Sequence, residues 1–189
     1  MVKLLNVAKF IGGFGAPAAG ASATHPLDTA LLLRLEKTVA EATAAFEGYD
    51  YTKALLVTET FFWSFCDDYV ELVKNRAYQQ DGSALATLKR ALDIMLQLFA
   101  PVLPFVTEEV WSNAHDESIH RSRWPDSDAL GVEPEANAAH LDEAATMIPE
   151  IRKAKRAARV SLRPVDRELN VHASADQLKQ VDAVADARR

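Results

Sequence analysis

The nucleophilic and acid-base side chains of this chain do not form a pattern that predicts catalysis. The single cysteine, Cys66, lies in an aromatic, apolar stretch, and the five histidines lie in segments that suggest no pairing with it. We therefore expect Cys66 to be a buried packing residue rather than a catalytic thiol. Asp67 and Asp68 are adjacent, and adjacent side chains on a helix diverge by about 100°. They do not form a paired acid and base, so we predict no catalytic residue in this chain.

Patterns that bind metals or nucleotides are also missing from the sequence. One cysteine cannot supply a clustered thiolate site, and no two histidines have the spacing of a helix-borne metal pair, so we expect His115 and His120 at the surface or in turns. The segment Gly12-Gly13-Phe14-Gly15 lacks the spacing of a dinucleotide fingerprint and is better explained as a flexible loop. We predict no metal and no cofactor within this chain.

Positive charge is concentrated in one stretch, although the formal net charge of the chain is -6. Between positions 148 and 167 the acidic residues are Glu150 and Asp166. The basic residues of the same stretch are Arg152, Lys153, Lys155, Arg156, Arg159, Arg163 and Arg167. A local positive surface of this kind can contact phosphate groups even when the whole chain is acidic.

The elements that must position these residues are amphipathic helices in series. Apolar residues recur at helical spacing in five stretches, at residues 3–11, about 26–47, about 51–78, about 83–99 and about 105–111. We expect Asp28 to place a negative charge in the first turn of the second helix, and Ser83 to cap the fourth. Short connections between successive amphipathic helices predict an antiparallel bundle.

After Trp111 the character of the sequence changes, which predicts a linker and a separate appendage. We expect a small extended segment at residues 118–123, followed by an acidic linker that contains Pro and Gly. Farther along, the patterns predict a helix over 141–160, a strand over 169–172 and a helix over 174–189. A lone strand and helix cannot bury their own apolar face. The predicted division is therefore a bundle over 1–125, a linker over 126–139, and a basic helix with a truncated α/β appendage over 140–189.

Five segments carry motifs that occur together in one known family. They are Lys3-Leu-Leu-Asn-Val-Ala-Lys-Phe10, the stretch 61–78 with its Phe-Cys-Asp-Asp-Tyr, the stretch 100–111 with its Pro-Phe-Val-Thr-Glu-Glu, and the stretches 118–125 and 151–163. In this order they resemble the helical domain of class I aminoacyl-tRNA synthetases for valine, isoleucine and leucine. The Phe-Cys-Asp-Asp-Tyr portion is most similar to the valine members. The resemblance implies a mainly α fold, an antiparallel bundle that binds the anticodon, followed by a partial small α/β appendage.

The resemblance also implies a function for the intact protein. Members of this family attach their amino acid, here valine, to its tRNA using ATP. The family's His-Ile-Gly-His and Lys-Met-Ser-Lys-Ser type signatures are not in this sequence, and neither is its editing domain. This chain would then recognise valine tRNA and perform no chemistry, and ATP would act elsewhere in the intact enzyme.

Helix-borne amide, cationic and aromatic side chains suit recognition of an anticodon, whose bases are unpaired and can stack and hydrogen-bond. Asn6, Lys9 and Phe10 lie within one turn of the first helix, and we predict that they contact the anticodon. The alternatives are a core role for Phe10 and simple solvation for Lys9. At the end of the long helix, in a position near the anticodon in related synthetases, we predict the same role for Lys74, Asn75 and Arg76.

Arg152, Arg156 and Arg159 are spaced i, i+4 and i+7 and so share one face of the predicted basic helix. We predict that they form a ridge that contacts the tRNA backbone. A solvated helix packed on the bundle is the alternative.

Partner and location follow as further expectations. We expect a cytoplasmic monomer that does not enter a membrane, because no apolar run reaches the roughly 18 residues of a spanning helix. Two rival functions stay open: the corresponding module of an isoleucine or leucine enzyme, and a helical scaffold that binds protein partners. A scaffold would show no affinity for tRNA at low salt.

Overall fold

The computed structural model describes residues 2–127, 130 and 140–141, and these residues are mainly helical. The α-helices are α1 (Val2–Gly12), α2 (Pro26–Glu47), α3 (Tyr51–Ser64), α4 (Val70–Tyr78), α5 (Gly82–Phe99) and α6 (Pro104–Trp111). A π turn, η1 (Phe65–Tyr69), joins α3 to α4, and a 3-10 turn, η2 (Ile119–Arg121), follows α6. The predicted mainly α fold is confirmed for this part of the chain.

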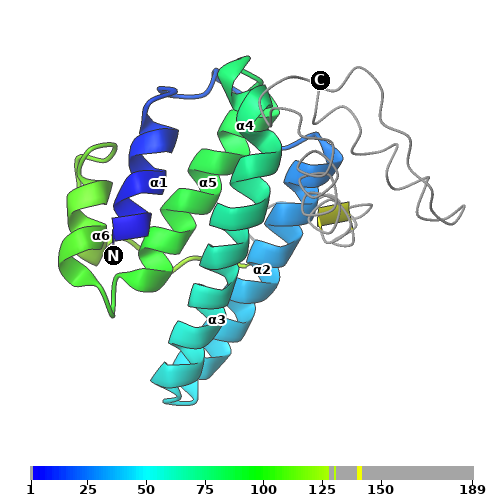
Figure 1. Ribbon diagram of the computed structural model, residues 1–189. Helices are drawn as coiled ribbons and strands as arrows, with labels where there is room; N and C mark the ends of the chain where they lie inside the picture. The colour runs from blue at the N-terminus through cyan, green and yellow to red at the C-terminus, as the bar shows by residue number, and fades with distance from the viewer. Residues whose placement is uncertain (1, 128–129, 131–139, 142–189) are drawn as a thin grey trace, which may run out of the picture.

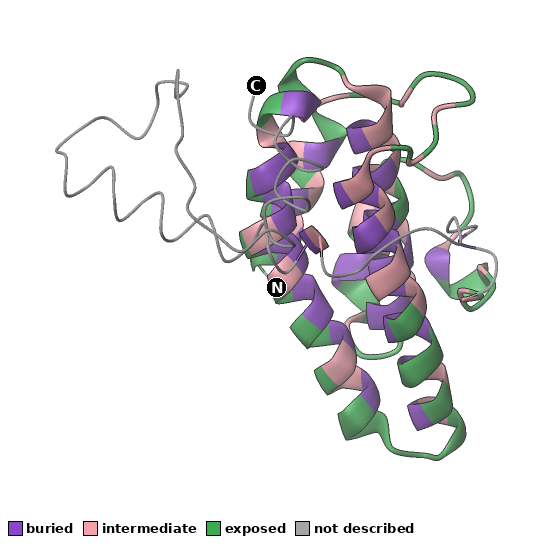
Figure 2. Cartoon of the chain, turned by 90° about the vertical axis from the view of Figure 1, so that its right-hand side faces the viewer, coloured by how far each residue is buried: buried purple, intermediate pink, exposed green. Residues whose placement is uncertain are grey.

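Helix α5 is the common packing partner of the bundle. It contacts α1, α2, α3, α4 and α6, while α2 and α3 pack along each other as an antiparallel pair (Figure 1). Buried side chains form stripes along the inward faces of the long helices, and exposed residues gather at the tip where α2 meets α3 (Figure 2). The buried side chains of all six helices belong to one apolar cluster. The predicted antiparallel bundle is therefore confirmed.

The predicted single helix over 51–78 contains a π turn that its periodicity did not indicate. At the end of this turn the backbone N–H of Val70 donates to the carbonyl of Phe65, five residues earlier. Phe65, Cys66 and Tyr69 are all buried in this turn. A π turn inside an α-helix is rare and often marks a functional or strained position. Here two large aromatic side chains and a cysteine from one short turn all enter the core.

Two tight connections join α2 to α3 and α4 to α5, and both have the same backbone geometry. Tyr49 and Gln80 each adopt a φ of 60°, the left-handed conformation that ends helices in a Schellman motif. The next residue is an aspartate that caps the following helix: Asp50 accepts from the N–H of Lys53, and Asp81 accepts from the N–H of Ala84 at 2.8 Å. The predicted cap at Ser83 was wrong, because the chain turns two residues earlier.

Residues 119–124, the crossing segment, run from α6 across the bundle to α2. The carboxylate of Glu108 on α6 accepts from the hydroxyl of Ser118 and from the N–H of Ile119 at 2.9 and 3.0 Å. At the other end, Trp124 donates from its indole N–H to the Thr43 hydroxyl of α2 at 2.8 Å. The sequence suggested an extended segment here, whereas the structure forms a 3-10 turn because Glu108 holds the first residues of the turn.

Several predicted features lie largely or wholly outside the described residues. They are the linker over 126–139, the basic helix with Arg152, Arg156 and Arg159, the strand over 169–172 and the final helix over 174–189. His140 and Leu141 are helical, and Leu141 is fully buried. In the part of the chain that the structure describes, no helix is both long enough and apolar enough to cross a membrane.

Candidate functional site

A buried ion pair fixes α4 against α2. Arg76 donates from Nη1 and Nη2 to the two carboxylate oxygens of Asp28, at 3.0 and 2.8 Å. Asp28 is fully buried, and it also accepts hydrogen bonds from the Tyr69 and Ser83 hydroxyls. The sequence placed Asp28 in the first turn of α2 as a charge near the helix N-terminus. The structure makes it the centre of a polar network within the core.

Arg76, which the sequence predicted as an anticodon contact, has its guanidinium buried within the bundle. Its side chain is 6% exposed, and Nη2 also pairs with Asp81 at 3.0 Å. Bidentate pairing of a guanidinium with a carboxylate is geometrically demanding, and it leaves few donors for another partner. Arg76 therefore holds the last turn of α4 in place, and both of its terminal nitrogens are engaged by carboxylates of the chain.

The network shifts the pKa values of Arg76, Tyr69 and Asp81. Burial alone would lower the pKa of Arg76, but the hydrogen bonds and charge of Asp28 outweigh this effect and raise it. Burial, reinforced by Asp28, raises the pKa of Tyr69 well above its usual value. Burial opposes ionisation of Asp81, yet the Ala84 N–H and Arg76 lower its pKa. The arginine stays charged and the tyrosine stays a neutral donor.

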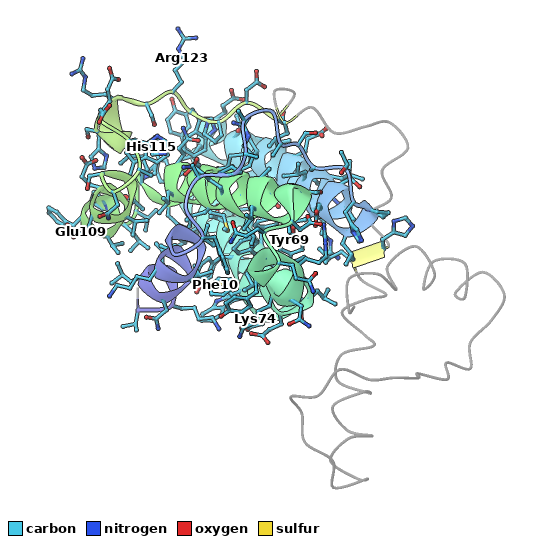
Figure 3. All side chains as sticks on the ribbon, turned by 90° about the horizontal axis from the view of Figure 1, so that it is seen from above. Phe10, Tyr69, Lys74, Glu109, His115 and Arg123 are labelled. Atoms are coloured by element: carbon cyan, nitrogen blue, oxygen red, sulfur yellow. The ribbon has the colours of Figure 1, made fainter. Side chains whose placement is uncertain are left out.

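Three aromatic rings and a lysine, from α1, α4 and the loop after α1, form the aromatic-cation surface (Phe10, Phe14, Lys74 and Tyr78). The ring centroids lie 4.9 Å apart for Phe10 and Phe14, 5.4 Å for Phe14 and Tyr78, and 6.2 Å for Phe10 and Tyr78. All three pairs are edge-to-face, the arrangement that aromatic quadrupoles favour. The Lys74 ammonium lies 5.9 Å from the Phe10 centroid, and Figure 3 shows these two residues side by side on neighbouring helices.

The exposure of this surface suits contact with flat, polyanionic ligands. Tyr78 is 63% exposed, whereas Phe10 and Phe14 are partly buried and rest against the core. Lys74 is about half exposed and lies 3.7 Å from the Glu71 carboxylate in the preceding turn. Aromatic faces beside a cation stack nucleic-acid bases and attract phosphates, and this combination is typical of surfaces that bind single-stranded nucleic acid.

The remaining predicted contact residues lie on the same helices and are exposed. Asn6 and Lys9 are exposed on α1, and Asn75 is exposed on α4. Lys9 follows a different face of α1 from Phe10, because it borders a groove of about 580 Å³ between α1, α5 and α6. The structure thus brings Phe10 and Lys74 into contact and places Lys9 around the side of α1.

Asp67 and Cys66 in the π turn have structural roles. Asp67 accepts a hydrogen bond from Lys3 at 2.8 Å, which ties α1 to the π turn, while Asp68 accepts from Ser64 within its own helix. The two carboxylates diverge, as their adjacency predicted. Cys66 is buried, and burial raises the pKa of its thiol to about 12. The prediction of a packing cysteine is confirmed.

The two histidines singled out in the sequence pack at the α6 end of the molecule. His115 stacks on Trp111 with ring centroids 3.7 Å apart, and its Nε2 lies 3.3 Å from the Asp93 carboxylate. His120 is exposed in η2, where its Nε2 lies 3.2 Å from the Pro104 carbonyl oxygen. Among the described residues, no three His, Cys, Asp or Glu side chains gather as metal ligands.

The sequence did not reveal Phe14 or Tyr78 as parts of the site. Tyr78 follows Lys74 by four residues, so both lie on one face of a helix, and this spacing was the available signal. Phe14 follows a glycine pair, and only the turn of the chain after α1 returns its ring to Phe10. The i, i+4 spacing places Tyr78 on the face of Lys74, but helical periodicity does not predict that the Phe14 ring contacts Phe10 and Tyr78.

Comparison with known proteins identifies the family to which this bundle belongs. Residues 28–171 match the family described as the anticodon-binding domain of tRNA ligase, and the chain belongs to this family. Among curated proteins, it is similar to the valine-tRNA ligase of Cutibacterium acnes, with 41% identity over 190 residues, which cover 97% of this chain and 22% of that protein. The valine-tRNA ligase of Leifsonia xyli is 44% identical over 195 residues, covering 100% of this chain and 22% of that protein.

A third relative, the valine-tRNA ligase of Thermobifida fusca, is 44% identical over 179 residues, covering 90% of this chain and 20% of that protein. The chain therefore spans about a fifth of the length of the curated relatives it matches.

Proposed function

We propose that this chain is the anticodon-recognising part of a valine-tRNA ligase. The observation that carries the proposal is the aromatic-cation surface at the junction of α1 and α4, on a member of an anticodon-binding family. The relatives that share 41–44% identity with the chain are valine-tRNA ligases, and this favours valine over isoleucine or leucine. The intact protein would attach valine to its tRNA with ATP in the cytoplasm, using parts of the enzyme outside this chain.

In this proposal, α1 and α4 bind the unpaired anticodon loop between them. The ring of Phe10 offers a surface for one base, and Lys74 and Lys9 neutralise neighbouring phosphates from two sides of α1. The exposed amides of Asn6 and Asn75 are candidates for hydrogen bonds to base edges, since an amide offers both donors and an acceptor. Arg76 contributes indirectly, because its pairing with Asp28 fixes the rotation of α4.

The basic stretch adds a second contact to the proposal. Arg152, Arg156 and Arg159 would bind the tRNA backbone away from the anticodon bases. Such contacts strengthen binding to any tRNA and carry no sequence information of their own.

A binding titration tests this function. The full chain is titrated at low salt with a valine tRNA and with versions whose anticodons have been exchanged. We expect weak binding that falls steeply with salt, and a preference for the valine anticodon. Equal binding of every anticodon would contradict base recognition by this surface, and no binding at low salt would favour the protein-scaffold alternative.

Two lysine variants make the titration specific to the site. Lys74→Gln removes a charge from the aromatic-cation surface and should reduce the salt slope of log Kd by roughly 0.7 to 1. Lys37→Gln is the matched control, because Lys37 is an exposed lysine on α2 that forms only a 3.8 Å pair with Glu41. An equal change in both variants would show that Lys74 acts only through the net charge of the chain.

A further inference from the structure

The most exposed ring of the aromatic-cation surface has no part in the anticodon contacts described so far. Tyr78 is the last residue of α4, one turn beyond Lys74, and more than half of its surface is open to solvent. The ring forms edge-to-face pairs with Phe14 and Phe10, at interplanar angles of 75° and 80°. A large ring left this exposed beside a cation is available to a flat ligand.

We propose that Tyr78 stacks a second unpaired base of the same RNA loop, in a plane steeply inclined to the base on Phe10. The proposal rests on the anticodon-binding function proposed above and extends it. A base stacks parallel to the ring that holds it. Because the Phe10 and Tyr78 rings meet at 80°, two bases on these rings cannot continue one stack. The RNA backbone must therefore turn between the two nucleotides.

The surroundings of Tyr78 hold its ring in position before RNA arrives. Phe14 packs edge-to-face with both Phe10 and Tyr78, at centroid distances of 4.9 and 5.4 Å, so its contacts help to fix the angle between those two rings. The backbone behind Tyr78 is fixed as well, since Gln80 closes α4 in the left-handed conformation and Arg76 is anchored to Asp28. A ring ordered in advance loses little conformational freedom on binding, which favours affinity.

In this arrangement Tyr78 contributes to the affinity for RNA and not to the discrimination between anticodon sequences. Stacking depends on the π face that every base has, so it tolerates any base. Tyr78 should therefore strengthen binding to all anticodons alike, and the choice between anticodons should come from neighbouring polar groups. The phenol hydroxyl is not required, so a phenylalanine at this position should serve equally well.

The test uses the full chain and the anticodon stem-loop of a valine tRNA carrying one fluorescent purine analogue, placed in turn at each unpaired loop position. Stacking on an aromatic ring changes the emission of such an analogue. With the unchanged chain we expect a change at two or more positions. Tyr78→Leu keeps an apolar contact for Phe14 but cannot stack a base, so one of these changes should disappear and Kd should rise about tenfold. Tyr78→Phe should retain every change.

The control is Tyr51→Ala, since Tyr51 is 57% exposed at the start of α3 and lies at the far tip of the bundle. It should leave both Kd and emission unaltered. The proposal is overturned if the unchanged chain binds the stem-loop and Tyr78→Leu binds equally tightly with the same emission at every position; the anticodon function would then stand without it. If the unchanged chain fails to bind the stem-loop at low salt, both this proposal and the proposed function are overturned.

Discussion

The guanidinium of Arg76 and the carboxylate of Asp28 are both buried, so the stability of the bundle is sensitive to the loss of either partner. Removing one partner of a buried pair leaves the other charge uncompensated, which is far more costly than losing the attraction alone. We expect Arg76→Met to lower the free energy of unfolding by about 3–5 kcal/mol, measured by urea denaturation followed by circular dichroism.

Two further variants distinguish the cost of leaving a buried charge unpaired from the effect of simply removing a positive charge. Lys37→Met removes an exposed lysine that pairs with Glu41 within one helix, and it should cost less than about 1 kcal/mol. The double variant Asp28→Leu with Arg76→Met should recover part of the loss, because no charge then remains buried. If Arg76→Met proves no more costly than Lys37→Met, the pair does not anchor α4.

The Cys66 thiol gives a second prediction, with a defined pH window. Its pKa is about 12 in the folded chain, against an ordinary value of 9.0. Below pH 9 the thiol is neutral in both states. As the pH rises from 9 toward 12, only the unfolded chain loses the proton, so the stability of the folded chain falls. The unfolding free energy of the native chain should therefore decline more between pH 8 and 10.5 than that of Cys66→Ala, measured by urea denaturation. If the unfolding free energies of the two chains changed equally with pH, the raised pKa of Cys66 would be contradicted.

At this scale the sequence predicted part of the site and missed part of it. Phe10 and Lys74 were named from the order of motifs and meet in the structure. Arg76 was assigned to the same site because it ends the same helix. Its partner Asp28 lies 48 residues earlier, and a contact over that separation leaves no trace in helical periodicity. The packing of Tyr78 on Phe14 is hidden for the same reason.

The tight connections between helices show how one residue can end one element and begin the next. Asp81 follows the left-handed Gln80, caps α5 through the Ala84 N–H, and pairs with Arg76. Asp50 occupies the equivalent place before α3 and caps it through the Lys53 N–H. The two aspartates therefore share a backbone role, and Asp81 has an ion pair in addition.

We expect Asp81→Ala to cost about 1–2 kcal/mol at pH 7, more than Asp50→Ala, measured by thermal or urea unfolding. The pKa of Asp81 is lowered in the folded chain, so its contribution is complete above its ordinary value of 3.8. That contribution is lost as the pH falls below 3.8 and the carboxylate is protonated. The difference in unfolding free energy between the native chain and Asp81→Ala should become smaller as the pH falls below 3.8. A constant difference down to pH 3 would show that its charge is unimportant.

The helices themselves were largely predictable, and their irregularities were not. The starts and ends predicted for α2 and α6 lie close to those observed, because proline, glycine and apolar spacing determine them locally. The π turn at Phe65–Tyr69 depends on burying Phe65, Cys66 and Tyr69 together against other helices. The 3-10 turn at Ile119–Arg121 depends on Glu108, a residue of the preceding helix. Both need tertiary contacts that a local pattern does not contain.

At the scale of the whole bundle, the crossing segment joins the α6 end to α2. Trp124 packs its ring on Phe46 at 5.2 Å and donates to Thr43, while Gln97 on α5 donates to the Arg123 carbonyl at 3.1 Å. These contacts connect three parts of the chain that lie far apart in sequence. The segment should therefore contribute to the stability of the entire bundle.

We expect Trp124→Ala to lower the free energy of unfolding by about 1–2 kcal/mol, since it removes a half-buried ring and a hydrogen bond. Thermal unfolding should still be a single transition when followed by circular dichroism and by the fluorescence of the remaining tryptophans. Phe105→Ala is the control, because Phe105 is 90% exposed and its loss should change stability by no more than about 0.5 kcal/mol. Equal effects of the two variants would mean that the segment does not brace the bundle.

In the last turns of α4, neighbouring residues have different roles, one structural and the others at the surface. Arg76 points inward and sets the rotation of the helix, while Lys74, Asn75 and Tyr78 on either side of it face outward and take no part in the buried network. In the proposed function, substitutions at Lys74 and Tyr78 accordingly change the strength of RNA binding, and substitutions at Asn75 change which base is preferred, without endangering the fold. This part of the bundle is suited to gradual retuning of specificity, one surface residue at a time.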